Sequence, residues 1–213
     1  ATVVSEVSDD IDGQVRNGST PDIGADEYTS SVGPPLAGTY TIGTVGATYT
    51  SFSSAVADLL LRGVSAPVTL NVLSGTYTDH VVMTSVPGAS ATNTITFQAQ
   101  TGNSANVTLA FAAAAPESNY VVWLKGADYL HFRKLTFRAN LSAGALYGTI
   151  FLLQGSVDNL FLDSTILRGV PASNSSLSYA VFYAPSALTR SLTISGNTFN
   201  DGGYGVYLQS PSY

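Results

Sequence analysis

Cysteine is absent from the 213 residues of this chain, and charged residues make up only 10% of it. The first absence excludes disulfides, thiolate metal sites and a cysteine nucleophile, so stability has to come from packing. The charged share is well below that of ordinary soluble domains, which is about a quarter. Hydroxyl and amide side chains must therefore cover most of the outer surface. Such a surface suits sugars or other proteins better than nucleic acid.

Long hydrophobic runs are also missing, although 45% of the residues are hydrophobic. No run approaches the ~20 residues that a membrane-spanning helix needs, so we expect no membrane insertion. The net charge of −6 is unevenly spread. Residues 1–27 hold seven acids against Arg16 alone, whereas the rest of the chain has seven acids and seven bases. This distribution argues against a nucleic-acid partner, which would need a basic surface.

A short apolar pattern occurs three times within residues 120–209. Its first positions are Leu130 and Phe132, then Leu160 and Leu162, then Leu192 and Ile194. The offsets between these pairs are 30 and 32 residues. Five and seven positions further on come Leu135 and Phe137, Thr165 and Leu167, and Asn197 and Phe199. Fixed self-similarity of this length predicts stacked structural units.

A second strand-like alternation precedes each of these blocks. It pairs Val121 with Trp123, Ile150 with Leu152, Val181 with Tyr183, and Val206 with Leu208. A period of two is typical of strands, and Gly, Asn, Asp and Ser separate the runs. A β-sandwich would also give short alternating strands, but it has no reason to keep one template at this interval. The pattern favours a parallel β-helix, in which equivalent residues of successive coils stack because one coil cannot bury its apolar row alone.

A helix is predicted over residues 51–62, just before the first coil. Its apolar face comprises Phe52, Ala55, Val56, Leu59 and Leu60, at helical spacing. Thr50 or Ser51 provides the N-cap, and Gly63 ends the helix. We expect it to lie across one end of the coil with Phe52, Val56, Leu59 and Leu60 inward.

This helix is followed by Val68, Val72, Gly75 and Tyr77 in a V-x-x-x-V-x-x-G-x-Y pattern. The combination resembles the first coil of pectin-esterase-like and pectate-lyase-like proteins, in which a short amphipathic helix plugs the open end. The resemblance implies an all-β fold, a right-handed parallel β-helix with a short N-terminal capping α-helix, over residues 39–213. The family's later catalytic segments, with Gln and paired Asp on consecutive coils, have no counterpart here.

Residues 1–28 contain the stretch "DIDGQVRNGSTPDIGADEY". It resembles the closing segment of bacterial secreted β-helix proteins, where a D-x-D-G…R…D-I-G-A-x-E pattern follows the last coils. The resemblance implies an acidic junction between two β-helical units, with residues 29–38 as a linker. The charged residues assigned to assembly are Asp10, Asp12, Arg16, Asp22, Asp26 and Glu27. We expect residues 1–28 to complete or contact the open C-terminal coil of a neighbouring unit.

Asp10 and Asp12 also match the start of a calcium loop, and they are the candidate metal ligands. A full loop needs Glu at its twelfth position, where this chain has Pro21. The expectation of a calcium site therefore rests on the density of carboxylates alone. The alternative is that Asp10 and Asp12 form hydrogen-bonded turns without a metal. No other cofactor is expected.

Stacking the repeats places outward residues in rows. Three rows carry charge: Arg133 with Asp163 and Ser195, Arg138 with Arg168 and Asn200, and Asp128 with Asp158 and Arg190. Pectate-lyase-like enzymes hold an Arg or Lys base and calcium-binding carboxylates on such rows, so the resemblance makes Lys134, Arg138 and Arg168 the candidate carbohydrate-binding residues. Surface ion pairing is the alternative, with Arg190 neutralising the two aspartates. A sugar-stacking face could also be lined by Tyr147, Tyr179, Tyr183, Tyr204 and Tyr207.

Two functions from different classes fit these features. The first is a structural segment of an extracellular fibre or cell-surface adhesin, assembled from β-helical units joined head to tail. The alternative is a polysaccharide-binding β-helix protein or a polysaccharide-degrading one, of lyase or glycoside hydrolase type. His80 and His131 have no Ser and carboxylate at triad spacing, so no catalytic residue is assigned.

Overall fold

The computed structural model describes residues 32–139, 145–172 and 174–209. The chain divides into two compact units, Ala1–Pro34 and Pro35–Tyr213, and the elements below belong to the second. Its first strand, β1 (Leu36–Ile42), begins inside the segment predicted as a linker, so residues 36–38 belong to a strand. The boundary predicted at residue 28 lies outside the described residues.

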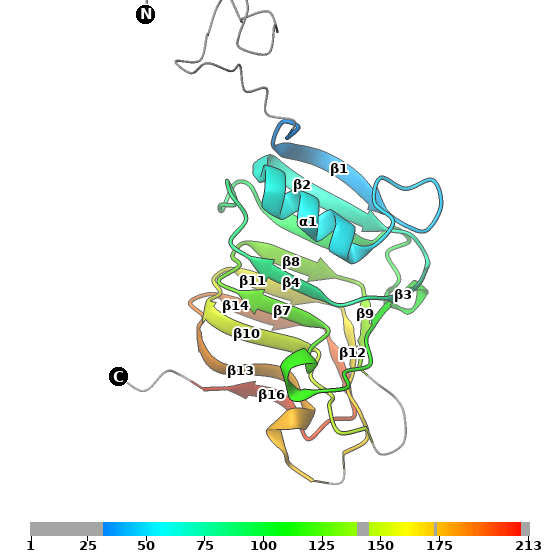
Figure 1. Cartoon of the computed structure of the whole chain (residues 1–213), viewed down its shortest axis with the longest axis vertical. Helices are drawn as coiled ribbons and strands as arrows, with labels where there is room; N and C mark the ends of the chain where they lie inside the picture. The colour runs from blue at the N-terminus through cyan, green and yellow to red at the C-terminus, as the bar shows by residue number, and fades with distance from the viewer. Residues whose placement is uncertain (1–31, 140–144, 173, 210–213) are drawn as a thin grey trace, which may run out of the picture. The chain divides into compact units, whose positions relative to one another are not determined.

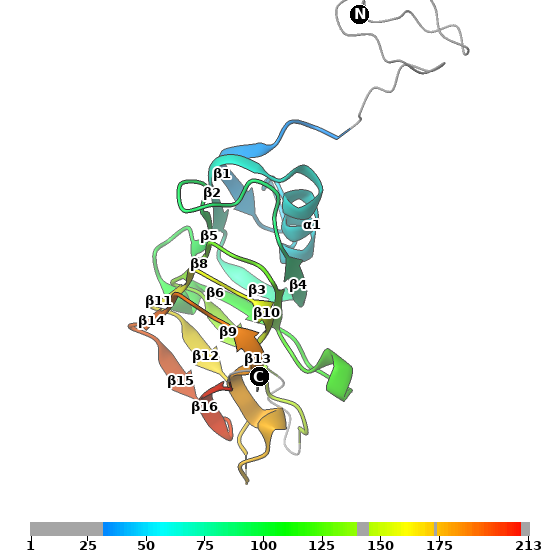
Figure 2. The ribbon, with the colours of Figure 1, turned by 90° about the vertical axis from the view of Figure 1, so that its left-hand side faces the viewer.

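Three parallel sheets form the second unit; each of five coils contributes one strand to each sheet, and β1 adds a sixth strand to the first sheet (Figures 1 and 2). Sheet 1 contains β1, β2 (Val64–Val72), β5 (Ile95–Ala99), β8 (Leu130–Arg133), β11 (Leu160–Asp163) and β14 (Leu192–Ser195). Sheet 2 contains β3 (Gly75–Thr78), β6 (Val107–Ala110), β9 (Thr136–Arg138), β12 (Ile166–Arg168) and β15 (Thr198–Asn200). Sheet 3 contains β4 (Val81–Thr84), β7 (Val122–Lys125), β10 (Phe151–Ser156), β13 (Ala180–Leu188) and β16 (Tyr204–Leu208). The predicted right-handed parallel β-helix is confirmed.

The predicted stacking register is also confirmed. Leu162 pairs with Phe132 on one side and with Ile194 on the other. A ladder of phenylalanine rings runs through the same interior, since ring centroids are 5.3 Å apart for Phe97 and Phe132 and 5.4 Å apart for Phe132 and Phe151. The apolar repeat therefore exists because each ring or aliphatic side chain is covered by its counterpart in the next coil.

In the last three coils, the corner between sheets 1 and 2 contains one left-handed residue. Lys134, Ser164 and Gly196 occupy equivalent positions, with φ of 53°, 56° and 64°. Only the last of the three is the residue type that adopts this conformation without steric cost. The corner amides stay in the ladder, because Lys134 N donates to Asp163 O at 2.9 Å and Ser164 N donates to Ser195 O at 2.9 Å.

Sheet 3 departs from the predicted alternation. In β7 the inward residues are Val122 and Leu124, and Trp123 lies on the outer face. The same shift by one position puts Leu152 of β10 and Tyr183 of β13 outside. These strands are apolar at nearly every position, so a period of two does not tell which set faces the core.

The N-terminal end of the coil is closed by α1 (Phe52–Arg62), as predicted. Ser51 is the N-cap and forms a capping box with Ser54. Phe52 and Leu59 are buried, and the Phe52 ring stacks on Phe97 with centroids 6.0 Å apart. Leu60 is partly buried against the core.

The free edge of β1 is occupied by the loop that leads to α1. Thr41 O accepts a hydrogen bond from Tyr49 N at 2.9 Å, and Thr41 N donates to Thr48 Oγ1 at 3.3 Å. Near the start of the strand, Ala37 N donates to the Tyr40 hydroxyl at 3.2 Å. Strand edges exposed to solvent invite pairing with other chains, and these contacts occupy part of the β1 edge.

The C-terminal end differs, because β14, β15 and β16 are the last strands of their sheets and no described strand follows them. Leu160 and Leu162 in the previous coil are fully buried, whereas Leu192 and Ile194 are partly exposed. In β16, Val206 is 42% exposed. This end therefore presents apolar side chains together with unpaired strand edges.

Candidate functional site

An outward row of apolar and aromatic side chains follows sheet 3. Strand register aligns Val82, Trp123, Leu152, Tyr183 and Tyr207, one from each coil. All five are partly exposed. Because neighbouring strands of a sheet lie about 4.8 Å apart, the row presents a continuous strip of rings and aliphatic groups. We call these five residues the aromatic row; their strands lie one below another beneath α1 in Figure 1.

A polar row runs beside the aromatic row, two residues further along β4, β7 and β10 and three residues further along β13, where the register shifts. Its register joins Thr84, Lys125, Gln154 and Ser186. Lys125 lies against the aromatic row, since its Nζ is 4.7 Å from the centroid of the Trp123 ring. Hydrogen-bonding groups therefore flank the rings on the same face.

More aromatic rings support the two ends of the aromatic row. Near the β4 end, the centroid of Tyr120 is 5.2 Å from that of Trp123, the second residue of the row. At the other end, Tyr207 lies 5.7 Å from Tyr183 and 5.4 Å from Tyr204. Such tilted and edge-on pairs hold each other in place and fix the orientation of the exposed surfaces.

The indole of Trp123 contributes through its ring. Its Nε1 atom is buried and has no hydrogen-bond partner, so the nitrogen is out of reach of a ligand at the surface. The part of Trp123 that remains exposed is aromatic carbon surface.

Acidic side chains are missing from the outward positions of sheet 3 that the structure describes. Hydrolysis of a glycosidic bond ordinarily needs two carboxyl groups on either side of it. Among the described residues, this face presents aromatic, aliphatic and hydrogen-bonding groups and no carboxylate pair.

The predicted basic residues lie elsewhere. Arg138 and Arg168 are register neighbours on β9 and β12, on the outer side of sheet 2. Lys134 is at the corner between sheets 1 and 2. The structure thus brings Arg138 and Arg168 together, but on a different sheet from the aromatic row. Of the five tyrosines suggested for sugar stacking, Tyr183 and Tyr207 belong to the row and Tyr204 supports it, whereas Tyr147 and Tyr179 lie in the connections before β10 and β13.

Stacked aspartates hold the corner between sheets 3 and 1. Asp128 Oδ1 accepts a hydrogen bond from Asp158 N at 2.6 Å, and Asp158 Oδ1 accepts one from Arg190 N at 2.7 Å. The partner of Asp158 is therefore the backbone amide of Arg190, which corrects the predicted neutralisation by its guanidinium. Asp163 instead forms a surface ion pair with Arg133 at 3.2 Å, the kind that contributes ~0–1 kcal/mol.

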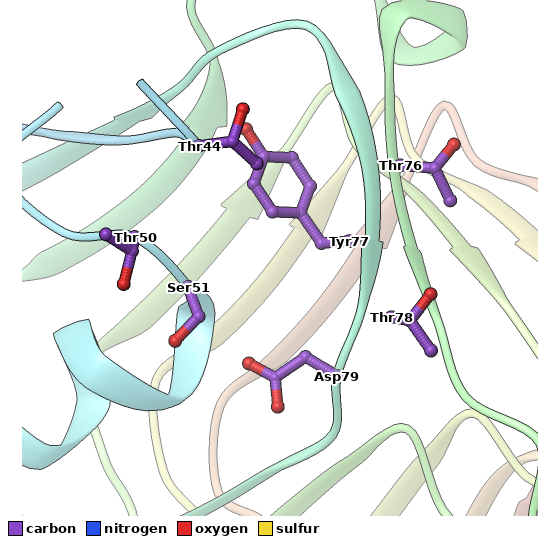
Figure 3. Close-up of a pocket in the computed structure, with 7 residues that line it drawn as sticks. All are labelled: Thr44, Thr50, Ser51, Thr76, Tyr77, Thr78 and Asp79. Atoms are coloured by element: carbon purple, nitrogen blue, oxygen red, sulfur yellow. The ribbon is translucent and has the colours of Figure 1, made fainter. Parts of the chain in front are cut away.

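A surface hollow of about 280 Å³ lies beside the N-terminus of α1 (Figure 3). Hydroxyl groups and one carboxylate surround it, from Thr44, Thr50, Ser51, Thr76, Tyr77, Thr78 and Asp79. Asp79 is already engaged, because it accepts hydrogen bonds from Ser53 N at 2.8 Å and Ser53 Oγ at 2.6 Å. The Tyr77 hydroxyl donates to Leu73 O at 2.8 Å. These hydrogen bonds of Asp79 and Tyr77 stabilise the N-terminal cap that α1 forms.

Metal ligands do not gather in the described parts of the chain, where no three His, Asp or Glu side chains form a cluster. Asp10 and Asp12, the candidate calcium ligands, lie outside the described residues, as do the other assembly candidates. Within those same limits, no helix is long and apolar enough to span a membrane.

Both histidines pack against aromatic rings. The His80 ring lies 4.0 Å from Phe111 between centroids, and the His131 ring lies 4.5 Å from Phe161. Burial, with a smaller contribution from the nearby Arg133 guanidinium, lowers the pKa of His131. These contacts give both histidine side chains a packing role against aromatic rings at the surface.

These features define a right-handed parallel β-helix with an aromatic outer row, the fold seen in pectate-lyase- and pectin-esterase-like proteins. The chain is similar to the crystal structure of the pectin methylesterase from Aspergillus niger, at 14% sequence identity and a TM-score of 0.37. The match covers 75% of this chain and 67% of the esterase. No protein-family model and no curated protein matches the sequence.

Proposed function

We propose that this protein binds polysaccharide through the aromatic row of sheet 3. The observation that carries the proposal is the register that aligns Trp123, Leu152, Tyr183 and Tyr207 on one outer face. In most other outward rows the repeat places hydroxyl, amide or charged side chains. A strip of rings on an otherwise polar protein needs a partner with an apolar face.

Sugar chains provide such a partner. A pyranose ring has an apolar face of C–H groups that stacks on an aromatic ring, and its rim of hydroxyl groups needs hydrogen bonds. Lys125 and Gln154, beside the aromatic row, supply donors and an acceptor for these hydroxyls. Ligand sites commonly combine apolar and aromatic surface with a few polar groups in this way.

The proposed activity is binding without cleavage, because the described part of the face carries no carboxylate pair. A ligand of this class also favours an extracellular or cell-surface location. The lyase or hydrolase alternative would instead require catalytic groups at the sheet 2 arginines, Arg138 and Arg168.

Affinity electrophoresis in gels containing neutral or acidic polysaccharides tests the proposal. We expect retardation of the protein by at least one glycan, and loss of most of it in Trp123→Ala and Tyr183→Ala. Phe161→Ala is the matched control, because Phe161 is a partly exposed aromatic on the outer face of sheet 1. Mobility that no glycan alters, or equal retardation of the Trp123 variant and wild type, contradicts the proposal.

A second candidate function is structural: β-helical units contact each other through their ends to build an extracellular fibre or adhesin. The observation that favours it is the last described coil, in which β14, β15 and β16 each pair with a described strand on one side only and Leu192, Ile194 and Phe199 are partly exposed. Sedimentation velocity over a wide range of concentrations tests it. Monomers at every concentration would remove this candidate.

A further inference from the structure

The spacing of the aromatic row limits which sugar chains can follow it. The row has one member in each of five coils, and the register between β4, β7 and β10 is continuous at Val82, Trp123 and Leu152. Neighbouring members are therefore about 4.8 Å apart along the helix axis. A fully extended chain of pyranose units advances by a similar distance per unit. Such a chain, laid along the axis, meets one member of the row per sugar.

The order of rings within the row favours a particular linkage. Trp123 and Tyr183 are separated by one aliphatic residue, Leu152, so the two rings are two coils apart, or about 9.6 Å. In a β-1,4-linked chain each unit is turned over relative to its neighbours, and the same face returns at every second unit. Both rings can then stack on equivalent faces of one straight chain, whereas a curved chain would leave the row after one contact.

The charge of the face favours a neutral chain. Among the outward residues that the structure describes on sheet 3, Lys125 is the only charged side chain, and its Nζ lies 4.7 Å from the centroid of the Trp123 ring. A polyanionic chain along five coils would need cations at intervals. Arg138 and Arg168 are on the outer side of sheet 2 and do not supply them.

The connections between sheets 2 and 3 obstruct the other direction, along the strands. The connection before β7 contains η2 (Pro116–Ser118), drawn in green, which projects to the right of β10 and β13 in Figure 2. It is joined to the connection before β13, because Asn119 Nδ2 donates to Ser178 O at 3.0 Å. Tyr120 brings it to 5.2 Å from the Trp123 ring, between centroids. A chain laid across the sheet would meet these connections beside the aromatic row.

We infer, on the basis of the proposed polysaccharide binding, that the ligand is a neutral, β-1,4-linked chain of pyranose units lying parallel to the helix axis, with one unit per coil. The aromatic row stacks on the sugar faces, and the polar row binds the hydroxyl groups along one side of the chain.

Isothermal titration calorimetry with soluble cello- and manno-oligosaccharides of two to six units tests the direction. We expect the affinity for at least one series to rise at least tenfold between three and five units and then to level off, because five coils contribute to the row. A chain lying across the sheet would reach its full affinity at two or three units.

Two variants separate the directions further. Tyr207→Ala removes the ring three coils from Trp123 and should lower the affinity for the five-unit chain at least fivefold. Ser156→Trp, the matched control, places a bulky side chain at the exposed end of β10, in the path of a chain that follows that strand. It should change the affinity less than twofold. Thermal melting shows whether each variant is folded.

An affinity that levels off at two or three units, or a larger loss in Ser156→Trp than in Tyr207→Ala, would overturn the axial direction. Tighter binding of malto-oligosaccharides, which are α-linked and curved, or of anionic oligogalacturonates would overturn the ligand class. Polysaccharide binding would stand in both cases. It would also stand if no oligosaccharide bound but a polysaccharide still retarded the protein in affinity gels, and the ligand class would then be wrong. Absence of both kinds of binding would overturn this inference and the proposed function together.

Discussion

The two ends of this β-helix differ in how fully their apolar cross-section and strand edges are covered. Ending a stack of coils exposes an apolar cross-section and the edges of three sheets. At the N-terminal end, α1 covers the cross-section with Phe52 and Leu59, and the loop before it occupies the β1 edge. At the C-terminal end, the described residues provide neither cover. The comparison shows that the cover of the N-terminal end comes from elements outside the strand repeat, α1 and the loop before it.

The largest effect is expected from a charge placed in the interior of the stack. Leu162→Asp puts a carboxylate at a fully buried position between Phe132 and Ile194, where it has no partner. Losses of more than ~4 kcal/mol follow from burying an unpaired charge, enough to unfold the domain. The same change at Ile194, in the last coil, should cost less because water reaches that position. Thermal melting followed by circular dichroism gives both values, and equal losses would contradict the proposed difference between the coils.

A smaller loss is expected from weakening the N-terminal cap. Phe52→Ala removes a buried ring that stacks on Phe97 and meets Tyr77 edge-on, a change that costs about 3–5 kcal/mol. Leu61→Ala on the same helix is the control, because Leu61 is 66% exposed. Urea denaturation measures both. A negligible effect at Phe52 would show that α1 does not close the coil.

The N-cap residue of α1 should contribute less to the free energy of unfolding. Ser51→Ala removes the side chain that accepts from Ser54 N, at a cost of about 1 kcal/mol. Thr50→Ala, at the neighbouring exposed residue, is the control and should be close to neutral. The unfolding midpoints in urea should separate the two variants; a larger loss at Thr50 would move the cap by one residue.

The smallest effect concerns how stability depends on pH through His131, which lies between the two ends of the β-helix. Burial and Arg133 lower the pKa of His131, so the folded state binds a proton less readily than the unfolded state. The contribution of His131 to stability is therefore fully present above its pKa in the unfolded state, near 6.5. This contribution is lost as the pH falls from there through the pKa in the folded state. We expect His131→Gln to reduce the drop in melting temperature between pH 7.5 and pH 5. An unchanged drop would assign the acid sensitivity to other groups.

Much of the N-terminal end could be read from local patterns. Helical spacing from Phe52 to Leu60, a hydroxyl residue before it and Gly63 after it are short-range signals, and they predicted α1 to within one residue at its start and at its observed end. The row of Arg138 and Arg168 followed from the repeat interval alone. Both are contacts between residues whose separation along the chain is regular, so counting residues was sufficient.

The aromatic row could not be read in the same way. Val122, Trp123 and Leu124 are all apolar, so each alternation offers an apolar face, and the pairing of Val121 with Trp123 in the sequence did not show that Trp123 lies on the outer face. The role of Arg190 was likewise missed, because a backbone amide that binds Asp158 leaves no trace in side-chain types.

The sequence by itself determined the stacked coils, their interval and the capping helix, since burial of a repeated apolar row constrains every coil alike. Which face of sheet 3 holds Trp123, Tyr183 and Tyr207 was decided by the tertiary structure. Left-handed corners at Lys134 and Ser164 close each coil at a set angle, and the interior then accepts Phe151 and Phe182 in register. Only one phase of each sheet 3 strand fits that interior, because shifting a strand by one residue turns every side chain to the opposite face.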